Sequence, residues 1–371
     1  MTGDNLRVCY VVNAVSETSV PADIASALNK YTDVEVDILA WFDVEPFDAD
    51  DRMSVTCVSA PDTTVGADPG TIRRAASELT AYDIVQAHHN HSGSFAKVIA
   101  TYLGIPSVSR EGNMRKGFTR LGRVANGLTN ALADRVVCNS HAVYESFRRW
   151  ENSMLPRENV AFIPNGVDFD RIDAGRNVDW SARETAGIDD GTVAVGTAGL
   201  LTEQKDHATL IRAIANANER SQDSIELVIA GDGPKEPMLR SIAAERGIED
   251  QVHFLGYLDR RRVYKMLSEI DIYAMPSMWE GFSAAAVEGI ALGNPAVFSD
   301  ILPFTEPYGD IARFHAVGDS DGLAEQLVDL AADPKERDRL AAAGRSLVEN
   351  KYKIERVATE YRDLYHEIRT E

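Results

Sequence analysis

The chain has 371 residues, 44% of them apolar, so it is long enough for two domains that each bury a core. Acidic residues outnumber basic ones by 58 to 38, and the net charge of −20 makes nucleic acid a poor partner. The acid is spread along the whole chain, as on the solvated surfaces of proteins that work in strong salt, where self-repulsion is screened. We therefore expect a halophilic protein.

The apolar runs are too short for a membrane span, which needs roughly 18 residues. No leader pattern precedes the first apolar run, so we expect a cytoplasmic protein, at most peripheral on the inner face of the cell membrane. The three cysteines stand in apolar runs and are expected as small buried side chains rather than as a disulfide or metal site: Cys9, Cys57 and Cys138.

Short apolar runs alternate with helical patterns through the first half of the chain. Strands are predicted at residues 6–13, 34–39, 83–87, 107–110, 135–139 and 160–164. Helices are predicted near residues 21–30, 70–80, 93–103, 116–132 and 141–150. This βαβ rhythm is typical of a parallel, doubly wound sheet, so we expect a first α/β domain over residues 1–168.

A polar stretch then runs to about Asp190 and is predicted as a linker. A second rhythm follows, with strands predicted at residues 192–198, 224–230, 251–255, 271–275 and 295–299. Helices are predicted near residues 205–220, 234–246, 259–268 and 283–293, and again from about 319 to 369 with a break near 333–334. Two doubly wound domains joined by a hinge imply a ligand-binding cleft between them.

The start of the predicted helix at 283–293 carries two acids, Glu280 and Glu288. If the stretch between them is helical, the carboxylates lie on the order of 12 Å apart, roughly the distance from the sugar of a sugar nucleotide to its ribose. Amides at the helix N-terminus would bind the phosphates between them. These are the amides of Gly281, Phe282 and Ser283. A helix-dipole role alone would explain Glu280 but not Glu288, which stands among apolar residues.

Several motifs occur in a fixed order over nearly the whole chain. They are ADRVVCNS at 133–140, IPNGVD at 163–168, LVIAGDGP at 227–234, VHFLG at 252–256, the segment 280–288, and GNPAV at 293–297. Through this ordered set the chain resembles glycosyltransferase family 4. Its members are retaining, nucleotide-sugar-dependent enzymes of the GT-B fold, which has two Rossmann-like domains with a cleft between them.

The resemblance implies that residues 169–351 bind the donor and residues 1–168 the acceptor. It also implies that the last helix, about 352–371, joins the first domain. Lys205 would be the main cation at the leaving diphosphate, and Glu280 would contact the donor sugar. Glu288 would bind the ribose hydroxyls.

The glycine turns of the second domain would complete the donor site by resemblance. They contain Gly199, Gly231 and Gly233, and the last two belong to the expected nucleobase contacts. Many family members carry arginine where this chain has Leu200, so one expected cation is absent.

On the acceptor side, two residues are candidates for catalysis. His89 lies among three histidines that end a predicted strand; their spacing matches no common zinc motif, so we expect one or two of them to face the cleft. Many relatives place a histidine after the next strand, and Glu111 stands roughly there. The glycine pair that relatives often carry after the first strand is replaced by Ser-Glu-Thr-Ser at 16–19.

A basic cluster follows the predicted strand at 107–110, with one acid, Glu111, among its five basic residues. It consists of Arg110, Arg115, Lys116, Arg120 and Arg123. This cluster would bind an acceptor phosphate, such as that of a polyprenyl-phosphate lipid, or an anionic membrane surface. A salt-bridged helix face is an equally good interpretation.

Asp48 and Asp50 match the DxD metal pattern of a different transferase fold, but nothing around them supports a metal site, so we expect no metal and no other cofactor. The sequence thus predicts a retaining, metal-independent, hexosyltransferase-like enzyme of polysaccharide or glycoconjugate biosynthesis. It would move a sugar from a nucleotide sugar to a glycan or lipid-linked acceptor. Two alternatives stay open: a nucleotide-sugar epimerase of the same architecture, and a non-catalytic nucleotide-sugar-binding protein.

Overall fold

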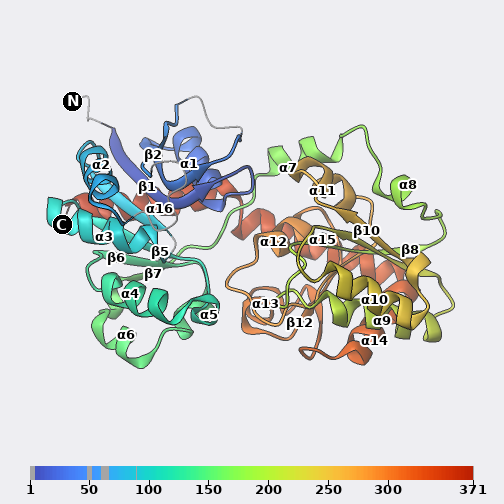
Figure 1. The fold of residues 1–371 in the computed structure, drawn as a ribbon. Helices are drawn as coiled ribbons and strands as arrows, with labels where there is room; N and C mark the ends of the chain where they lie inside the picture. The colour runs from blue at the N-terminus through green and yellow to red at the C-terminus, as the bar shows by residue number, and fades with distance from the viewer. Residues whose placement is uncertain (1–4, 48–51, 60–66, 89, 371) are drawn as a thin grey trace. The chain divides into compact units, whose positions relative to one another are not determined.

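The structure, a computed structural model, describes residues 5–47, 52–59, 67–88 and 90–370 (Figure 1). The chain divides into two compact units, the first formed by residues 1–166 with 354–371 and the second by residues 167–353. The sequence placed these boundaries at residue 168 and at about residue 352.

The first unit is built on a seven-stranded sheet in the order β3-β2-β1-β4-β5-β6-β7, with every strand pair parallel. Its strands are β1 (Leu6–Val15), β2 (Val34–Val44), β3 (Val55–Cys57), β4 (Ile84–His88), β5 (Ser107–Glu111), β6 (Arg135–Cys138) and β7 (Val160–Phe162). Its α-helices are α1 (Val20–Tyr31), α2 (Pro69–Leu79), α3 (Ser92–Leu103), α4 (Arg120–Asn130), α5 (His141–Glu145), α6 (Arg149–Met154) and α16 (Ile354–Thr370). The central strand β1 is an almost continuous buried run, which a strand needs when helices cover both faces of its sheet.

The second unit has a six-stranded parallel sheet in the order β10-β9-β8-β11-β12-β13. Its strands are β8 (Val193–Ala198), β9 (Ile225–Ala230), β10 (Val252–Gly256), β11 (Ile272–Met275), β12 (Ala296–Ser299) and β13 (Ala312–His315). Its α-helices are α7 (Phe169–Arg176), α8 (Ala182–Ala186), α9 (His207–Arg220), α10 (Glu236–Arg246), α11 (Arg260–Leu267), α12 (Ala284–Ala291), α13 (Leu302–Tyr308), α14 (Ser320–Ala332) and α15 (Pro334–Lys351). Successive residues of β8 enter two different cores, Ala194 one and Val195 the other, so this sheet too is covered on both faces.

Helix α16 belongs to the first unit, where it packs against α1. Its buried side recurs at helical spacing, from Ile354 through Val357, Tyr361 and Tyr365. The hydroxyl of Tyr365 donates to Gln86 Oε1 at 2.7 Å and lies 2.8 Å from the hydroxyl of Tyr10. The last helix is therefore held by a buried polar contact as well as by apolar packing.

The linker prediction up to Asp190 is wrong, because this stretch contains helices α7 and α8. Both begin at capping side chains: Asp168 accepts from the amide of Arg171, and Ser181 from that of Glu184. These helices are short and bury few apolar residues, so their periodicity is weak. The sequence also missed strands β3 and β13, which are three and four residues long.

Candidate active site

The loops that follow β8, β9 and β10 are joined to one another by their backbones. The amide of Leu201 donates to the carbonyl of Asp232 at 2.7 Å, and the amide of Gly231 donates to that of Gly256 at 2.8 Å. The carboxyl ends of three neighbouring strands thus form one connected edge, the place where doubly wound sheets bind ligands.

Three glycines make this close packing feasible. Gly199, Gly231 and Gly233 have φ values of +155°, +136° and +154°, which favour glycine. A Cβ atom on Gly231 would lie 2.0 Å from the carbonyl oxygen of Gly199, and one on Gly233 would lie 2.7 Å from the backbone of Leu201. The structure brings together the three glycines that the sequence assigned to donor binding; that role remains a prediction.

Lys205 and Glu280 form an ion pair at this edge, with Nζ 2.6 Å from Oε1. Glu280 is 5% exposed and also accepts from Ser277 Oγ at 3.0 Å. The loop that carries Glu280 is tied to the β8 loop, because the amide of Met278 donates to the carbonyl of Gln204 at 2.8 Å. The sequence named both charged residues as donor ligands but did not predict that they contact each other.

Helix α12 begins only at Ala284, with Ser283 as its N-cap; the side chain of Ser283 accepts from the amide of Ala286 at 3.3 Å. Glu280 therefore lies before the helix, and the estimate of 12 Å between the two carboxylates, which assumed a helix from 280 to 288, does not apply. Gly281 and Phe282 are buried just ahead of the cap.

Glu288 lies on α12, half-buried, and accepts from the hydroxyl of Tyr264 at 2.6 Å. Burial, and then the negative charge of Glu288, raise the pKa of Tyr264 well above its usual value, so the phenol stays protonated and acts as the donor. Tyr264 comes from α11 and was missed, since nothing in the sequence links the two helices.

A second missed residue, His207, opens α9 directly after the loop of Lys205. The side chain is 2% exposed, and its Nδ1 atom has no hydrogen-bond partner within the described part of the chain. Burial, and then the charge of Lys205, lower the pKa of His207 to about 4. The imidazole is thus neutral around pH 7 and adds no positive charge beside Lys205.

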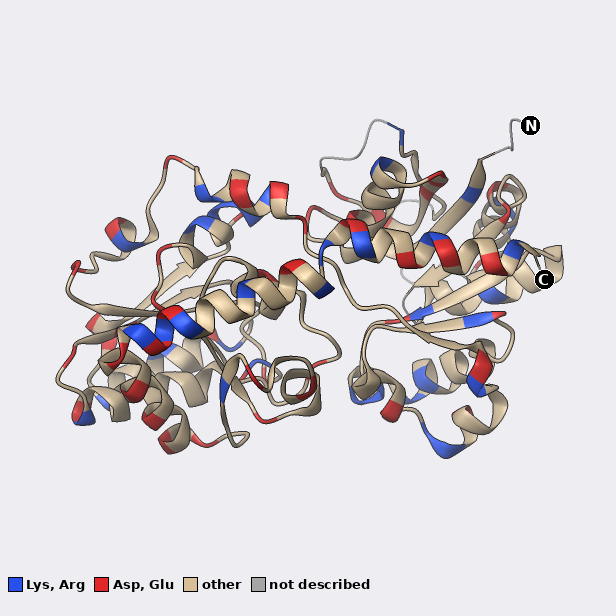
Figure 2. Cartoon of the chain, turned by 180° about the vertical axis from the view of Figure 1, so that it is seen from behind, with Lys and Arg blue, Asp and Glu red and all other residues tan. Residues whose placement is uncertain are grey.

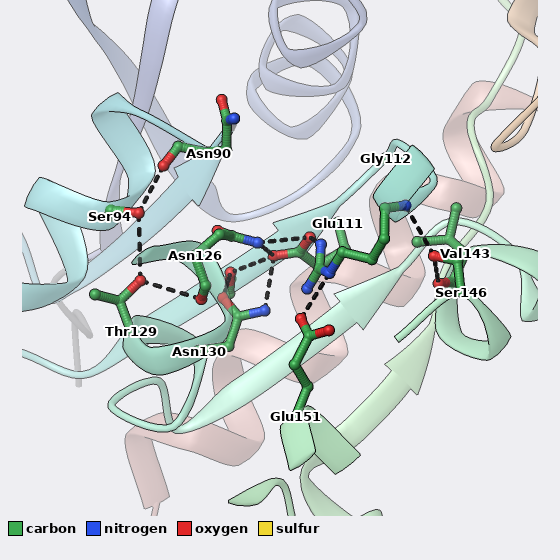
Figure 3. A network of polar contacts seen from close by, with 12 residues as sticks. Asn90, Ser94, Glu111, Gly112, Asn126, Thr129, Asn130, Val143, Ser146 and Glu151 are labelled. Atoms are coloured by element: carbon green, nitrogen blue, oxygen red, sulfur yellow. Dashed lines mark hydrogen bonds and ion pairs between the residues drawn. The ribbon is translucent and has the colours of Figure 1, made fainter. Parts of the chain in front are cut away.

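In the first unit, Glu111 is the centre of a buried polar network (Figure 3). It accepts from Arg115 Nη1 at 2.7 Å, from Asn126 at 2.9 and 3.1 Å, and from Asn130 at 2.9 Å. Arg115 also binds Glu151 at 2.7 Å. Glu111 and Arg115 are 4% and 3% exposed, and these bonds hold both side chains inside the first unit. The buried Nη2 atom of Arg115 has no hydrogen-bond partner within the described part of the chain. The catalytic role of Glu111 and the acceptor or membrane role of Arg115 remain predictions.

A buried lysine completes this network from α3. Lys97 Nζ donates to Ser109 and Asn126, both at 3.1 Å, and is fully shielded from solvent. Burial lowers the pKa of Lys97 to about 8, against the opposing effect of Glu111. Burial alone would raise the pKa of Glu111, but the charges of Arg115 and Lys97 outweigh it and lower that pKa to about 2.

The other predicted acceptor-side residues are divided between the interior and the surface. Arg110 is 8% exposed and donates hydrogen bonds to Tyr361 and Asn165, and its ligand role remains a prediction. Lys116 and Arg120 are exposed, and Arg123 is half-buried.

Two predictions fall outside the described residues: His89, and the DxD pattern of Asp48 and Asp50. The neighbouring His88 is buried, 3.0 Å from the amide of Gln86. Over the ranges that the structure describes, no three His, Cys, Asp or Glu side chains are grouped to hold a metal ion.

The family follows from two matches that together span most of the chain. Residues 19–171 match the family model "Glycosyltransferase Family 4", and residues 178–347 match "Glycosyl transferases group 1". The chain belongs to glycosyltransferase family 4. The resemblance on which the sequence motifs converged is confirmed.

Two curated relatives show how far the similarity extends. The chain is 28% identical over 240 residues to the putative glycosyltransferase EpsF of Bacillus subtilis, which is 62% of this chain and 61% of EpsF. It is 31% identical over 233 residues to the phosphatidyl-myo-inositol mannosyltransferase of Mycobacterium leprae, which is 62% of this chain and 59% of that protein. The chain thus matches about three fifths of the length of these family 4 relatives.

Solved structures resemble the fold over nearly the whole chain. Anabaena Alr3699/HepE, in complex with UDP and glucose, gives a TM-score of 0.81 at 17% identity, covering 98% of this chain and all of that one. WaaG, a glycosyltransferase involved in lipopolysaccharide biosynthesis, gives 0.73 at 15% identity, covering 96% and 99%. These likenesses confirm the predicted GT-B class, with two Rossmann-like domains.

Proposed function

We propose that this family 4 protein is a retaining glycosyltransferase that moves a sugar from a nucleotide sugar to a glycan or lipid-linked acceptor. The observation that carries the proposal is the Lys205–Glu280 pair, held at the carboxyl edge of the second sheet by loops that pack glycine against backbone. This arrangement offers one cation for a diphosphate and one carboxylate for sugar hydroxyls, fixed beside each other.

The chemistry follows from where charge develops. As the bond from sugar to phosphate breaks, negative charge grows on the leaving diphosphate, and the Lys205 ammonium stabilises it. Glu280 accepts hydrogen bonds from the sugar, and Glu288 accepts them from the ribose. The acceptor hydroxyl attacks from the face that the diphosphate leaves, and a phosphate oxygen takes its proton, which retains the configuration at the anomeric carbon.

The names of similar proteins support a nucleotide-sugar donor and a glycoconjugate acceptor. Anabaena Alr3699/HepE has been solved with UDP-glucose, and one relative is named as a GDP-mannose-dependent mannosyltransferase of a phosphatidylinositol monomannoside. We propose the same class of donor here, without assigning the base or the sugar.

We further propose that neither a metal nor another cofactor takes part, because Lys205 would supply the positive charge that a divalent cation brings to a leaving diphosphate. Transfer should then proceed at an unchanged rate in EDTA. A loss of activity in EDTA that Mg²⁺ or Mn²⁺ restores would contradict this part of the proposal.

The dispersed acidic residues support a working environment of high salt. We propose that the protein works in the cytoplasm or peripherally on the inner face of the cell membrane. Figure 2 shows acidic residues on helices and loops of both units. In the part of the chain that the structure describes, no helix has the length and apolarity to cross a bilayer.

A binding panel at high salt tests the function. UDP, GDP, dTDP and their sugars are compared by thermal shift, and the ligand that binds is then used in a transfer assay. Lys205→Met should weaken binding of the diphosphate on the order of tenfold, the usual effect of losing a charge-assisted hydrogen bond. Lys335→Met, at an exposed lysine on α15, is the matched control and should bind as the wild type does.

The two alternatives have distinct outcomes in the same assay. An epimerase would alter the sugar of the donor with no acceptor present. A non-catalytic binding protein would show the thermal shift, and Glu280→Gln would leave the cellular glycan unchanged. Absence of any shift with every nucleotide would contradict the proposed donor site.

A further inference from the structure

Helix α4 is amphipathic in the inverse sense: its polar side is buried and its apolar side is exposed. Asn126 and Asn130 are buried and bind Glu111, whereas Leu121, Val124 and Leu128 are 80%, 48% and 52% exposed. A helix that only covers a sheet buries its apolar side. The outward apolar side of α4 therefore serves something outside the first unit.

The exposed apolar residues of α4 form a narrow stripe. At 3.6 residues per turn they fall within a sector of about 60°. Leu132, in the turn after the helix, continues it and is 43% exposed. On the neighbouring helix α3, Val98 and Tyr102 are exposed one turn apart, at 49% and 87%.

Helices α3 and α4 are held together by hydrogen bonds that Lys97 on α3 donates to Asn126 and Asn130 on α4. Six of the twelve large apolar side chains that are exposed among the described residues thus belong to this pair of helices and the turn that follows.

The same part of the chain has far fewer acidic residues than the rest of the sequence. Between Asp83 and Asp134 the sequence contains one acidic residue, Glu111, although the whole chain has 58 acids in 371 residues. Glu111 is buried, so it adds no acid to this surface. Lys116 and Arg120 are exposed just ahead of the apolar stripe. This surface is the part of the first unit best suited to approach an anionic layer.

We propose that the outer face of α4, with the exposed residues of α3, docks on an anionic phospholipid bilayer. The leucines of the stripe enter the interfacial region, and Lys116 and Arg120 contact lipid phosphates. A second copy of this chain is the other candidate occupant. Parallel pairing of the stripe about a twofold axis would bring Lys116 and Arg120 of both copies together, whereas antiparallel pairing would separate them, so the oligomeric state of the leucine variant distinguishes the two occupants.

The location of the surface agrees with a lipid-linked acceptor. Helix α4 follows β5, and the chain passes from the carboxyl end of that strand to Lys116 and Arg120 within nine residues of Glu111. Only one part of the inference rests on the proposed function, namely the kind of acceptor that would be delivered to this surface. Bilayer binding itself needs no donor and no transfer.

Vesicle co-sedimentation of the full chain tests the docking surface. Vesicles of phosphatidylcholine alone are compared with vesicles that also contain phosphatidylglycerol. The wild type should sediment with the anionic vesicles, and the Leu121→Ser, Leu128→Ser double variant should bind at least about tenfold more weakly because apolar burial is lost. The control is Met238→Ser with Val317→Ser, at apolar positions of the second unit that are 43% and 40% exposed.

The basic residues are tested by reversing their charge. Lys116→Glu with Arg120→Glu should lower binding to anionic vesicles on the order of fivefold for each lost cation, before the added repulsion. Arg246→Glu with Lys335→Glu, at exposed positions of the second unit, is the matched control. Neither pair should alter the thermal shift with nucleotides, so a failure of docking is distinguishable from a failure of the donor site.

The proposal is overturned if the wild type leaves anionic vesicles unbound, or if the test and control pairs lose binding equally. It is also overturned if the leucine variant dissociates a dimer while vesicle binding stays the same, since a second copy would then occupy the stripe.

Discussion

Among single residues, Lys205 is paired with the nearly buried carboxylate of Glu280, at the edge where we propose that the donor binds. Ser277 and Lys205 both bind Glu280 Oε1, so the carboxylate is fixed and cannot swing freely toward a sugar. A bound diphosphate would bring further negative charge to the same ammonium. The affinity for a diphosphate should therefore be higher if another cation lies near Lys205.

Leu200 occupies the position where many relatives carry arginine, and its side chain is 62% exposed. Leu200→Arg should leave the fold intact and add a cation beside the Gly199 turn. We expect the affinity for the nucleoside diphosphate to rise on the order of tenfold, as for one charged hydrogen bond. Isothermal titration calorimetry measures it, with Leu200→Gln as the polar control without charge. Equal affinities for both variants would contradict a diphosphate at this turn.

The Glu111 network predicts how stability depends on pH. The folded pKa of Glu111 is lowered to about 2 from 4.5, so the ionised carboxylate stabilises the fold above about pH 4.5, and this contribution is lost as the pH falls toward 2. Glu111→Gln should destabilise the protein near pH 7 by roughly 3 kcal/mol, because Arg115 and Lys97 lose their shared anion. The free energy of unfolding of the Glu111→Gln variant should then fall less steeply between pH 4.5 and 2 than that of the wild type.

Denaturant unfolding at a series of pH values measures this difference. Glu349→Gln, at an exposed carboxylate of α15, is the control and should follow the wild-type curve. Parallel curves for wild type and Glu111→Gln over the acid range would show that Glu111 is not the ionised centre of the network.

At the scale of elements, α16 illustrates how one buried polar contact fixes a helix. The hydroxyl of Tyr365 contacts both Tyr10 and Gln86, and the side chain is fully buried. Tyr365→Phe should lower the free energy of unfolding of the first unit by about 2 kcal/mol, because two partners lose a bond. Equal stability of Tyr365→Phe and the wild type by denaturant titration would contradict this role.

Most of the sheet strands could be predicted because a strand covered on both faces has a continuous apolar run, as β1 and β9 do. Helices α7 and α8 could not, because a helix of two turns or fewer has too few positions to show a period. The inverted orientation of α4 was equally hidden. Its 3.6-residue period is clear in the sequence, but the period does not say which side faces the sheet.

Motifs in the sequence singled out Lys205 and Glu280 as candidate donor ligands, but did not predict that the two side chains contact each other. Lys205 and Glu280 are 75 positions apart, and only the folded sheet brings the β8 and β11 loops together. The burial of Glu111 and Arg115 was hidden for a related reason. Glu111 and Arg115 look like a surface cluster in the sequence, but Asn126, Asn130 and Lys97 supply enough bonds to make their burial favourable.

At the scale of the whole molecule, the net charge of −20 predicts stability that increases with salt. The Debye length falls from about 10 Å at 0.1 M to about 3 Å at 1 M, so repulsion among surface carboxylates is largely removed. We expect the Tm to rise by roughly 5 to 10 °C between low salt and molar KCl, a gain of a few kcal/mol. Differential scanning calorimetry at several KCl concentrations measures it. A highest Tm at low salt would contradict a halophilic surface.

The central claim is that a nucleotide sugar binds at the carboxyl edge of the second sheet, between the Lys205–Glu280 pair and Glu288. A crystal structure with the tightest-binding nucleoside diphosphate tests it most directly. We expect phosphate oxygens within hydrogen-bond distance of Lys205 Nζ and the ribose hydroxyls at Glu288. A nucleotide bound elsewhere, with the Lys205–Glu280 pair unchanged and free of phosphate, would contradict it.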